Sequence, residues 1–189
     1  MKLADTAVDI IYRIATGSKQ KRTLLAPLGA IVFLSIVAMF IALGPLVDWL
    51  LKLPPLLPTP FNIVFSLPLL ITGLVIYVWA LRQFVRFKGT PMPFNPLPTV
   101  MTTGPYAYCR NPILDSLFLA MLGLGFLIRS VSLVFLATPL FVLVNVWMTK
   151  AIEEPELVRR LGEDYIRYRE ITPMFIPRLT ARLSEKREK

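Results

Sequence analysis

The chain has 189 residues, of which 55% are hydrophobic and only 17% are charged, and this composition excludes several classes of protein. It is too apolar for an ordinary soluble domain, in which about a quarter of residues are charged, and too apolar for a disordered chain. A single cysteine excludes a disulfide scaffold, and the absence of histidine excludes histidine-ligated metal sites and imidazole bases. The net charge of +9 would suit nucleic acid. In so apolar a chain it instead favours basic segments that face anionic membrane lipids, so we expect no nucleic-acid or metal partner.

The segment 1–22 precedes the first long apolar run. Its apolar side chains recur at helical spacing, at Leu3, Ala7, Ile10, Ile11 and Ile14. The charged side chains lie elsewhere around the helix. This pattern predicts an amphipathic helix on the cytoplasmic surface of the membrane. A loosely attached tail is the alternative.

Four apolar runs predict four transmembrane helices, at 23–47, 61–81, 112–128 and 131–149. About 20 apolar residues of helix cross a bilayer core. The prolines of 53–60 exclude a helix there, because proline lacks a backbone donor and restricts the residue before it. Only Arg129 and Ser130 separate the last two runs, so these form a tight antiparallel hairpin. The expected fold is an all-α polytopic integral membrane protein.

The basic residues predict the orientation of these helices. Most lysines and arginines lie before the first run, between the second and third runs, or after the fourth, whereas Lys52 and Arg129 lie on the other side. Both termini are therefore expected in the cytoplasm, which agrees with four crossings. The short chain and short loops favour a bacterial inner membrane.

Two cytoplasmic segments concentrate unusual residues. The segment 89–112 is rich in proline, glycine and aromatic residues, which predicts an ordered non-helical loop, with Pro112 opening the third helix. The segment 153–177 begins with Glu153 and Glu154, and a short surface helix follows Pro155. Because ionisable residues are nearly absent at membrane depth, these segments favour a site at the inner interface over a pore.

The charges of these segments suit an amphoteric ligand. Glu153 and Glu154 end an apolar helix, where partly desolvated carboxylates would bind an ammonium or sulfonium group. Arg110 offers a planar fork of donors for a carboxylate. The alternative is that the glutamates occupy a solvated helix end and that Arg110 anchors a lipid phosphate. Spacing alone does not decide between these interpretations.

The two segments together resemble the membrane methyltransferases typified by isoprenylcysteine carboxyl methyltransferase and the phospholipid N-methyltransferases. The residues that carry the resemblance are Gly104-Pro-Tyr106, Tyr108-Cys-Arg110-Asn-Pro112, Glu153-Glu154, Leu157, Gly162-Glu-Asp-Tyr165, Tyr168, Pro173 and Phe175-Ile-Pro177. They occur in the family's order and on either side of one helical hairpin.

The resemblance implies S-adenosylmethionine-dependent methyl transfer, with the cofactor entering from the cytosol and a lipophilic acceptor from the bilayer. It implies that Arg110, Glu153 and Glu154 are catalytic. The implied cofactor contacts are Pro98, Thr99, Val100, Met101, Tyr106, Arg110, Asn111, Pro112, Ile113, Leu114 and Glu153. The chain then divides into the amphipathic segment 1–22, the first two membrane helices at 23–88, a methyltransferase core at 89–178 and a basic tail at 179–189.

The acceptor stays open. Asn111 and Leu114 stand where the family often has a histidine and an aromatic residue, and Thr149 stands where the prenylcysteine enzymes have an arginine. An oxygen, nitrogen or sulfur acceptor is compatible with this pattern. The alternatives are an NADPH-dependent enzyme like the sterol reductases, which are longer, and a non-catalytic membrane scaffold of the same fold. The oligomeric state is open.

Overall fold

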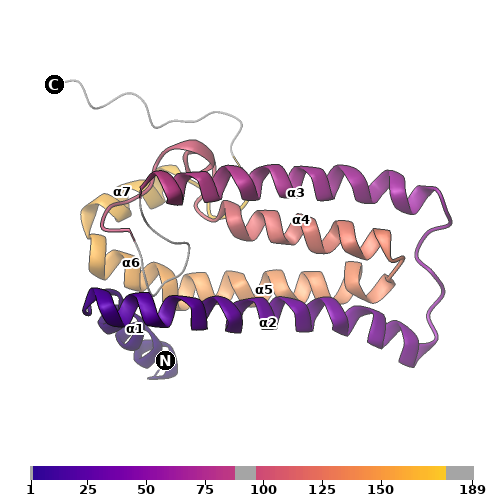
Figure 1. The fold of residues 1–189 in the computed structure, drawn as a ribbon, viewed down its shortest axis with the longest axis horizontal. Helices are drawn as coiled ribbons and strands as arrows, with labels where there is room; N and C mark the ends of the chain where they lie inside the picture. Colours follow the sequence, from indigo (N-terminus) through magenta and orange to yellow (C-terminus); the bar gives the residue numbers. More distant parts are fainter. Residues whose placement is uncertain (1, 88–96, 178–189) are drawn as a thin grey trace. The chain divides into compact units, whose positions relative to one another are not determined.

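The computed structural model describes residues 2–87 and 97–177. Those residues form helices and connecting segments without a strand, which confirms the all-α fold (Figure 1). Residues 89–96 of the predicted loop and the predicted basic tail lie outside the described residues. The chain divides into two compact units: the first contains 1–30, 78–112 and 147–189, and the second contains 31–77 and 113–146.

The helices follow one another in the order that the sequence predicts. Their bounds are α1 Lys2–Ala15, α2 Lys19–Leu51, α3 Phe61–Arg86, the 3-10 turn η1 Gly104–Ala107, α4 Pro112–Leu127, the π turn η2 Leu133–Ala137, α5 Thr138–Met148, the π turn η3 Thr149–Glu153, α6 Glu154–Leu161 and α7 Glu163–Ile171.

Within 2–87 and 97–177, three helical stretches are long and apolar enough to cross a membrane: Pro27–Leu51, Phe61–Arg86 and Leu133–Leu161. The fourth apolar helix, α4, has 16 residues and is therefore about 24 Å long, somewhat short of a hydrocarbon core of about 30 Å. This set of three long helices and one shorter helix confirms the prediction of a polytopic membrane protein. Large apolar side chains are exposed along α2 and α3, as a lipid-facing surface requires; examples are Leu24, Ile31, Val64 and Leu74.

Both π turns end just before a proline. The Thr138 N–H donates to the Leu133 carbonyl, and the Glu154 N–H donates to the Thr149 carbonyl, each five residues back. Pro139 follows the first of these donors, and a proline ring crowds the carbonyl four residues before it. Widening the turn relieves that crowding, and Pro155 has the same relation to η3. Each π turn adds a residue and so rotates the side chains that follow it.

The second unit has a core contributed by α2, α4, η2 and α5. Its buried residues are Val37, Phe40, Met121, Leu133, Ala137 and Phe141. The Phe141 ring meets Phe40 and Phe118 edge-on, with centroids 5.1 and 5.9 Å away. A Cβ added to Gly44 would lie only 2.6 Å from Leu133 Cα, so glycine permits this close approach of α2 to η2. Figure 1 shows α2 running beside α5, and α3 beside α4.

The turn that joins α4 to η2 confirms the predicted tight hairpin. Asp48 near the end of α2 accepts hydrogen bonds from the Ser130 hydroxyl and from the Ser132 N–H, the latter at 2.9 Å. Arg129 has a positive φ of 62° and donates from Nε to the Leu57 carbonyl at 2.6 Å. Asp48 therefore supplies the first backbone donors of the last membrane helix with an acceptor.

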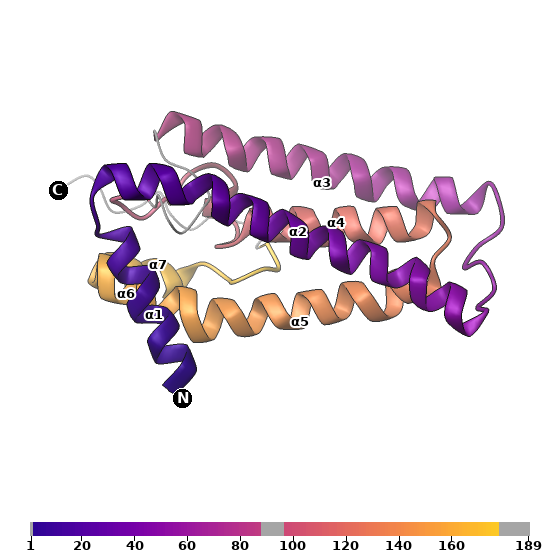
Figure 2. The ribbon, with the colours of Figure 1, turned by 60° about the horizontal axis from the view of Figure 1, so that its bottom comes forward.

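In the first unit, α1 lies against α6 and η3 (Figure 2). Arg159 pairs with Asp9 at 2.5 Å and lies 4.1 Å above the centre of the Tyr12 ring. The structure thus has a helix at the N-terminus, as the amphipathic pattern predicts, and it contacts α6 and η3 in place of forming a loose tail. Its position on the membrane surface stays a prediction. The single helix expected after Pro155 is wrong, because α6 and α7 are separate. Gly162 breaks them with φ 57° and ψ −136°, a conformation that L side chains rarely adopt.

Candidate functional site

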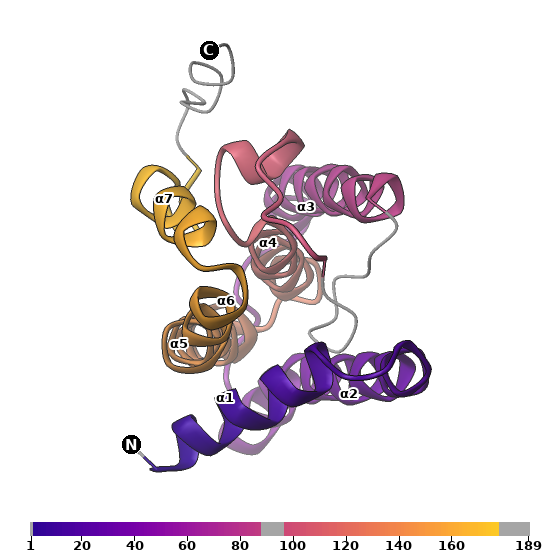
Figure 3. The ribbon, with the colours of Figure 1, turned by 90° about the vertical axis from the view of Figure 1, so that its left-hand side faces the viewer.

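The segment that contains η1 lies between α7 and the end of α3 in the first unit (Figure 3). The Arg110 N–H donates to the Pro173 carbonyl at 2.9 Å. The Asn111 N–H and side-chain amide both donate to the Met174 carbonyl, at 3.2 and 3.3 Å. The residues that follow η1 and the residues that follow α7, more than 60 positions apart in the sequence, are therefore joined backbone to backbone.

Buried tyrosines make a second connection between these elements. The Tyr168 hydroxyl donates to the Tyr106 carbonyl at 2.7 Å, and the Tyr106 ring meets Phe84 edge-on at 5.9 Å. Burial raises the pKa of both Tyr106 and Tyr168 above the usual range of tyrosine. Tyr168 therefore keeps its proton, and remains a donor to η1, at any physiological pH.

Arg110 and Glu154 form a buried ion pair, each side chain being 10% exposed. Arg169 Nη1 lies 3.8 Å from the other carboxylate oxygen of Glu154. Burial raises the pKa of the neighbouring Tyr165 to about 12, and the charge of Glu154 acts in the same direction. Arg110 Nε is buried and has no hydrogen-bond partner among the described residues. The pair is thus nearly dry and retains one unused donor.

The structure separates the two glutamates that the sequence could not tell apart. Glu154 opens α6 and pairs with Arg110. Glu153 ends η3, is half-buried, and accepts a hydrogen bond from the Thr149 hydroxyl at 3.4 Å. Among the described residues Glu153 forms no ion pair within salt-bridge distance. Of the two carboxylates, that of Glu153 is therefore the one more available to a ligand.

The predicted contacts at Pro98 to Met101 belong to a segment that is fixed at both ends; we call residues 97–103 the strap. Pro98 and Thr99 are exposed, Val100 is half-buried, and Leu97 and Met101 are buried. Arg160 Nη1 donates to the Leu97 carbonyl at 2.7 Å, and the Thr103 hydroxyl donates to Gln83 Oε1 at 3.3 Å.

The residues that hold the strap could not be recognised from the sequence. Glu156 and Arg160 stand four apart, a spacing that permits a helical ion pair. Nothing in the sequence, however, shows that Arg160 also reaches Leu97, or that Gln83 reaches Thr103. Both contacts join segments at least 20 positions apart.

The comparisons with known proteins bear on this set of residues. A sequence model of the phospholipid methyltransferase family matches residues 61–164, more than half of the chain. The chain belongs to this family. It is a family of integral membrane methyltransferases, which agrees with the apolar helices and with the resemblance of the two polar segments.

One curated relative is the nickel-cobalt-cadmium resistance protein NccN of Alcaligenes xylosoxydans xylosoxydans. It is 33% identical to this chain over 86 residues, which are 46% of this chain and 39% of the relative. The match thus spans well under half of that relative's length. No solved structure matches the chain.

The phospholipid methyltransferase match covers the predicted site from α3 to the start of α7. It includes Arg110, Glu153 and Glu154, and ends before Tyr165, Tyr168 and the Pro173 carbonyl that receives the Arg110 N–H. Pro112 is buried at the start of α4. Ile113 and Leu114 follow it on the first turn, are half-buried, and belong to the second unit. Of the predicted residues, the structure brings Arg110 and Glu154 into direct contact.

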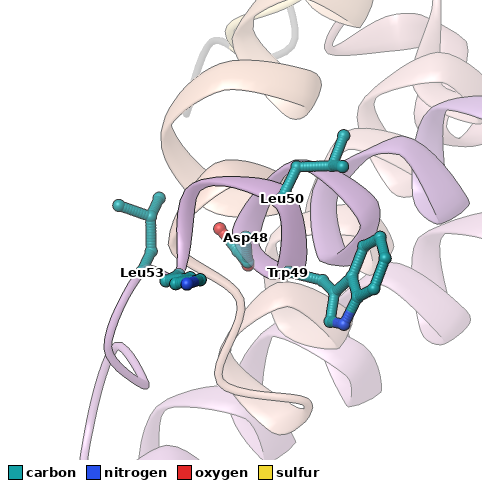
Figure 4. A pocket seen from close by; sticks show the side chains of 5 residues that line it. Asp48, Trp49, Leu50 and Leu53 are labelled. Atoms are coloured by element: carbon teal, nitrogen blue, oxygen red, sulfur yellow. The ribbon is translucent and has the colours of Figure 1, made fainter.

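A separate hollow lies in the second unit and contains none of the predicted site residues. Asp48, Trp49, Leu50, Lys52 and Leu53 line it. In Figure 4, Trp49 and Leu53 extend in opposite directions with Asp48 between them. The carboxylate of Asp48 is already engaged with the hairpin turn, so its role here is structural. In the described part of the chain, no three His, Cys, Asp or Glu residues lie close enough to hold a metal ion.

Proposed function

We propose that this member of the phospholipid methyltransferase family transfers a methyl group from S-adenosylmethionine to a lipophilic acceptor. The observation that carries the proposal is the buried Arg110–Glu154 pair, with its unused Nε donor, inside the matched region. A dry charged pair with an unused donor is expensive to maintain in a fold that does not use it.

The residues of the site fit the charges of this cofactor. S-adenosylmethionine carries an ammonium, a carboxylate and a sulfonium group. Arg110 Nε is a buried donor suited to an anionic oxygen. Glu153 is a half-buried carboxylate that accepts a hydrogen bond from the Thr149 hydroxyl at 3.4 Å, and it is suited to a cation. Exposed Pro98 and Thr99 provide an open stretch of chain beside α6.

In the proposed reaction the cofactor supplies the chemistry, and the residues of the site bind and orient it. When bound, the cofactor supplies a methyl group already activated by its sulfonium, so the chain needs no strong base. Glu153 binds the ammonium group and Arg110 binds the carboxylate. The hydrogen bonds from Arg110 and Asn111 to Pro173 and Met174 keep the polar segments in register, which fixes the direction of the donor. Tyr106 and Tyr168, both buried, help to exclude water.

We infer that the acceptor approaches from the lipid phase. Apolar side chains are exposed along the long helices, so an apolar substrate can reach the protein without leaving the bilayer; Leu143 and Trp147 are 65% and 59% exposed on α5. The acceptor atom is an oxygen, nitrogen or sulfur of a lipid or another hydrophobic molecule. We infer a site at the cytoplasmic face of the membrane from the basic residues in the sequence, and a bacterial inner membrane from the short loops.

A second candidate is a non-catalytic scaffold of the same fold. The observation that favours it is the side-chain amide of Asn111, which donates to the Met174 carbonyl at 3.3 Å and so serves the fold at a position where the family often has a histidine. A scaffold would keep the joined segments and lose methyl transfer.

Calorimetry on detergent-purified protein tests the proposal. S-adenosylmethionine, S-adenosylhomocysteine and NADPH are titrated into the wild type, Glu153→Gln and the control Glu170→Gln, which alters an exposed carboxylate on α7. We expect both adenosyl ligands to bind, with about tenfold or greater loss in Glu153→Gln and none in Glu170→Gln. NADPH binding alone would move the assignment to a reductase, and folded protein that binds none of the three would leave the scaffold. Adenosyl binding without turnover on any acceptor would also favour the scaffold.

A further inference from the structure

Two adjacent arginines of α6 have different surroundings. The Arg159 side chain is 50% exposed and pairs with Asp9, whose side chain is 54% exposed. Arg160 is 12% exposed and pairs with Glu156, which is 6% exposed. Exposed pairs contribute little, whereas burying an arginine, which stays protonated, costs free energy unless its donors are partnered. Arg160 therefore has a role in the interior that its neighbour lacks.

The guanidinium of Arg160 makes three directed contacts. Its Nε and Nη2 lie 2.6 and 3.3 Å from the two oxygens of Glu156, and its Nη1 donates to the Leu97 carbonyl at 2.7 Å. The two bonds to Glu156 fix the plane of the fork, and this plane aims the third donor at the strap. A lysine ammonium on a flexible stem would not reproduce the arrangement.

The far end of the strap is held independently. The Thr103 hydroxyl donates to Gln83 on α3. The next residue, Gly104, has a φ of 61°, and a Cβ there would lie 2.5 Å from Gln83 Nε2. The five residues between these anchors include exposed Pro98 and Thr99. Arg160 is thus the anchor at one end of a short segment whose other end is already fixed.

We propose that Arg160, oriented by Glu156, is a positioning residue that sets the strap for ligand binding. This inference rests on the proposed function, in which Pro98 to Met101 contact the cofactor. Arg160 itself need not touch the ligand. Its bond to the Leu97 carbonyl fixes the path of the backbone that does so.

The first test measures the strap without any ligand. Thr99→Cys places a thiol on the exposed part of the strap, and the native Cys109 is only 2% exposed and gives the background rate. Alkylation by a maleimide is followed in this protein, with the double substitution Glu156→Leu/Arg160→Leu, with Arg160→Lys, and with the control Arg159→Lys. Replacing both partners of a buried pair by apolar residues preserves stability better than removing one.

We expect the rate of alkylation at position 99 to differ by about tenfold from that of the Thr99→Cys protein when Glu156→Leu/Arg160→Leu or Arg160→Lys is added. Adding Arg159→Lys should leave the rate unchanged. An unchanged rate in the Leu/Leu protein overturns the proposal. Where that protein does not fold, Arg160→Lys decides, and an unchanged rate there overturns it as well.

The second test measures binding of S-adenosylhomocysteine in the same variants without Thr99→Cys. We expect the affinity to fall about tenfold in Arg160→Lys, with the thermal unfolding midpoint kept, and to be unchanged in Arg159→Lys. A mobilised strap with wild-type affinity overturns the role in binding. If the wild type itself does not bind, the proposed function fails and the role of the strap in binding falls with it; the alkylation result still decides separately whether Arg160 holds the strap.

Discussion

Arg110 is fixed by contacts of both its backbone and its side chain. Its backbone N–H binds Pro173, its guanidinium pairs with Glu154, and the Tyr165 hydroxyl lies beside it. The carboxylate of Glu154 is also approached by Arg169. This set of contacts fixes Arg110 before any ligand arrives, which lowers the entropic cost of binding.

Arg110→Leu should destabilise the protein by about 3–5 kcal/mol, because Glu154 would remain buried without its main partner. The matched double substitution Arg110→Leu/Glu154→Leu should recover part of that loss. Thermal unfolding in detergent measures both, with Arg159→Ala as the control for an exposed pair, where about 0–1 kcal/mol is expected. Equal losses for Arg110→Leu and Arg159→Ala would show that the Arg110–Glu154 pair is solvated.

Tyr165 predicts a loss of stability at high pH. Its pKa is about 12 in the folded protein against an ordinary value of 10.0. Between these values the unfolded chain releases a proton that the folded protein retains, so the free energy of unfolding falls as pH rises from 10 to 12. Denaturant unfolding across this range should show a smaller slope in Tyr165→Phe than in the wild type. The same slope in both proteins would contradict the buried position of Tyr165.

At the scale of the elements, the sequence predicts most of the helices because apolar runs and prolines have local causes. The run before Lys52 and the start of α3 at Phe61 follow directly from hydropathy and from the prolines between them. The break at Gly162 also had a local signal, since glycine is a poor helix former, but the amphipathic pattern continued across it and concealed it.

The pairing of Arg110 with Glu154 instead of Glu153 could not be predicted. The π turn η3 inserts a residue just before Pro155, and the helical phase of both glutamates depends on that insertion. The partners of Arg160 were hidden for a different reason, because the bond to Leu97 depends on how distant segments fold back. The sequence thus indicates which residues belong to the candidate site, whereas the contacts between them can be seen only in the structure.

The close approach of α2 to η2 predicts a strong effect of Gly44→Ala. The added Cβ would lie 2.5 Å from Leu133 Cβ and 2.8 Å from its backbone nitrogen, and a backbone cannot move aside cheaply. We expect a destabilisation of about 1–3 kcal/mol. Thermal unfolding measures it beside Leu46→Ala, which alters an exposed side chain of the same helix and should change little. A neutral Gly44→Ala would contradict this helix contact.

At the scale of the whole molecule, the basic residues predict the orientation. Lys52 follows α2, and Arg86 is the last residue of α3. The second membrane helix therefore separates the two positions. We expect a membrane-impermeant maleimide to label Lys52→Cys in intact cells and Arg86→Cys only after the inner membrane is opened. Both positions are exposed, and Cys109 is buried. The reverse order of labelling would invert the topology and place the site on the outer face.

Methyl transfer to a molecule of the membrane is the proposed activity, and the most direct measurement follows the methyl group itself. Membranes containing the wild type, Glu153→Gln or Glu170→Gln are incubated with methyl-labelled S-adenosylmethionine and extracted with organic solvent. We predict label in the organic phase for the wild type and Glu170→Gln, and a loss of at least about tenfold for Glu153→Gln. Equal label in the wild type and in membranes without the protein would contradict methyl transfer by this protein.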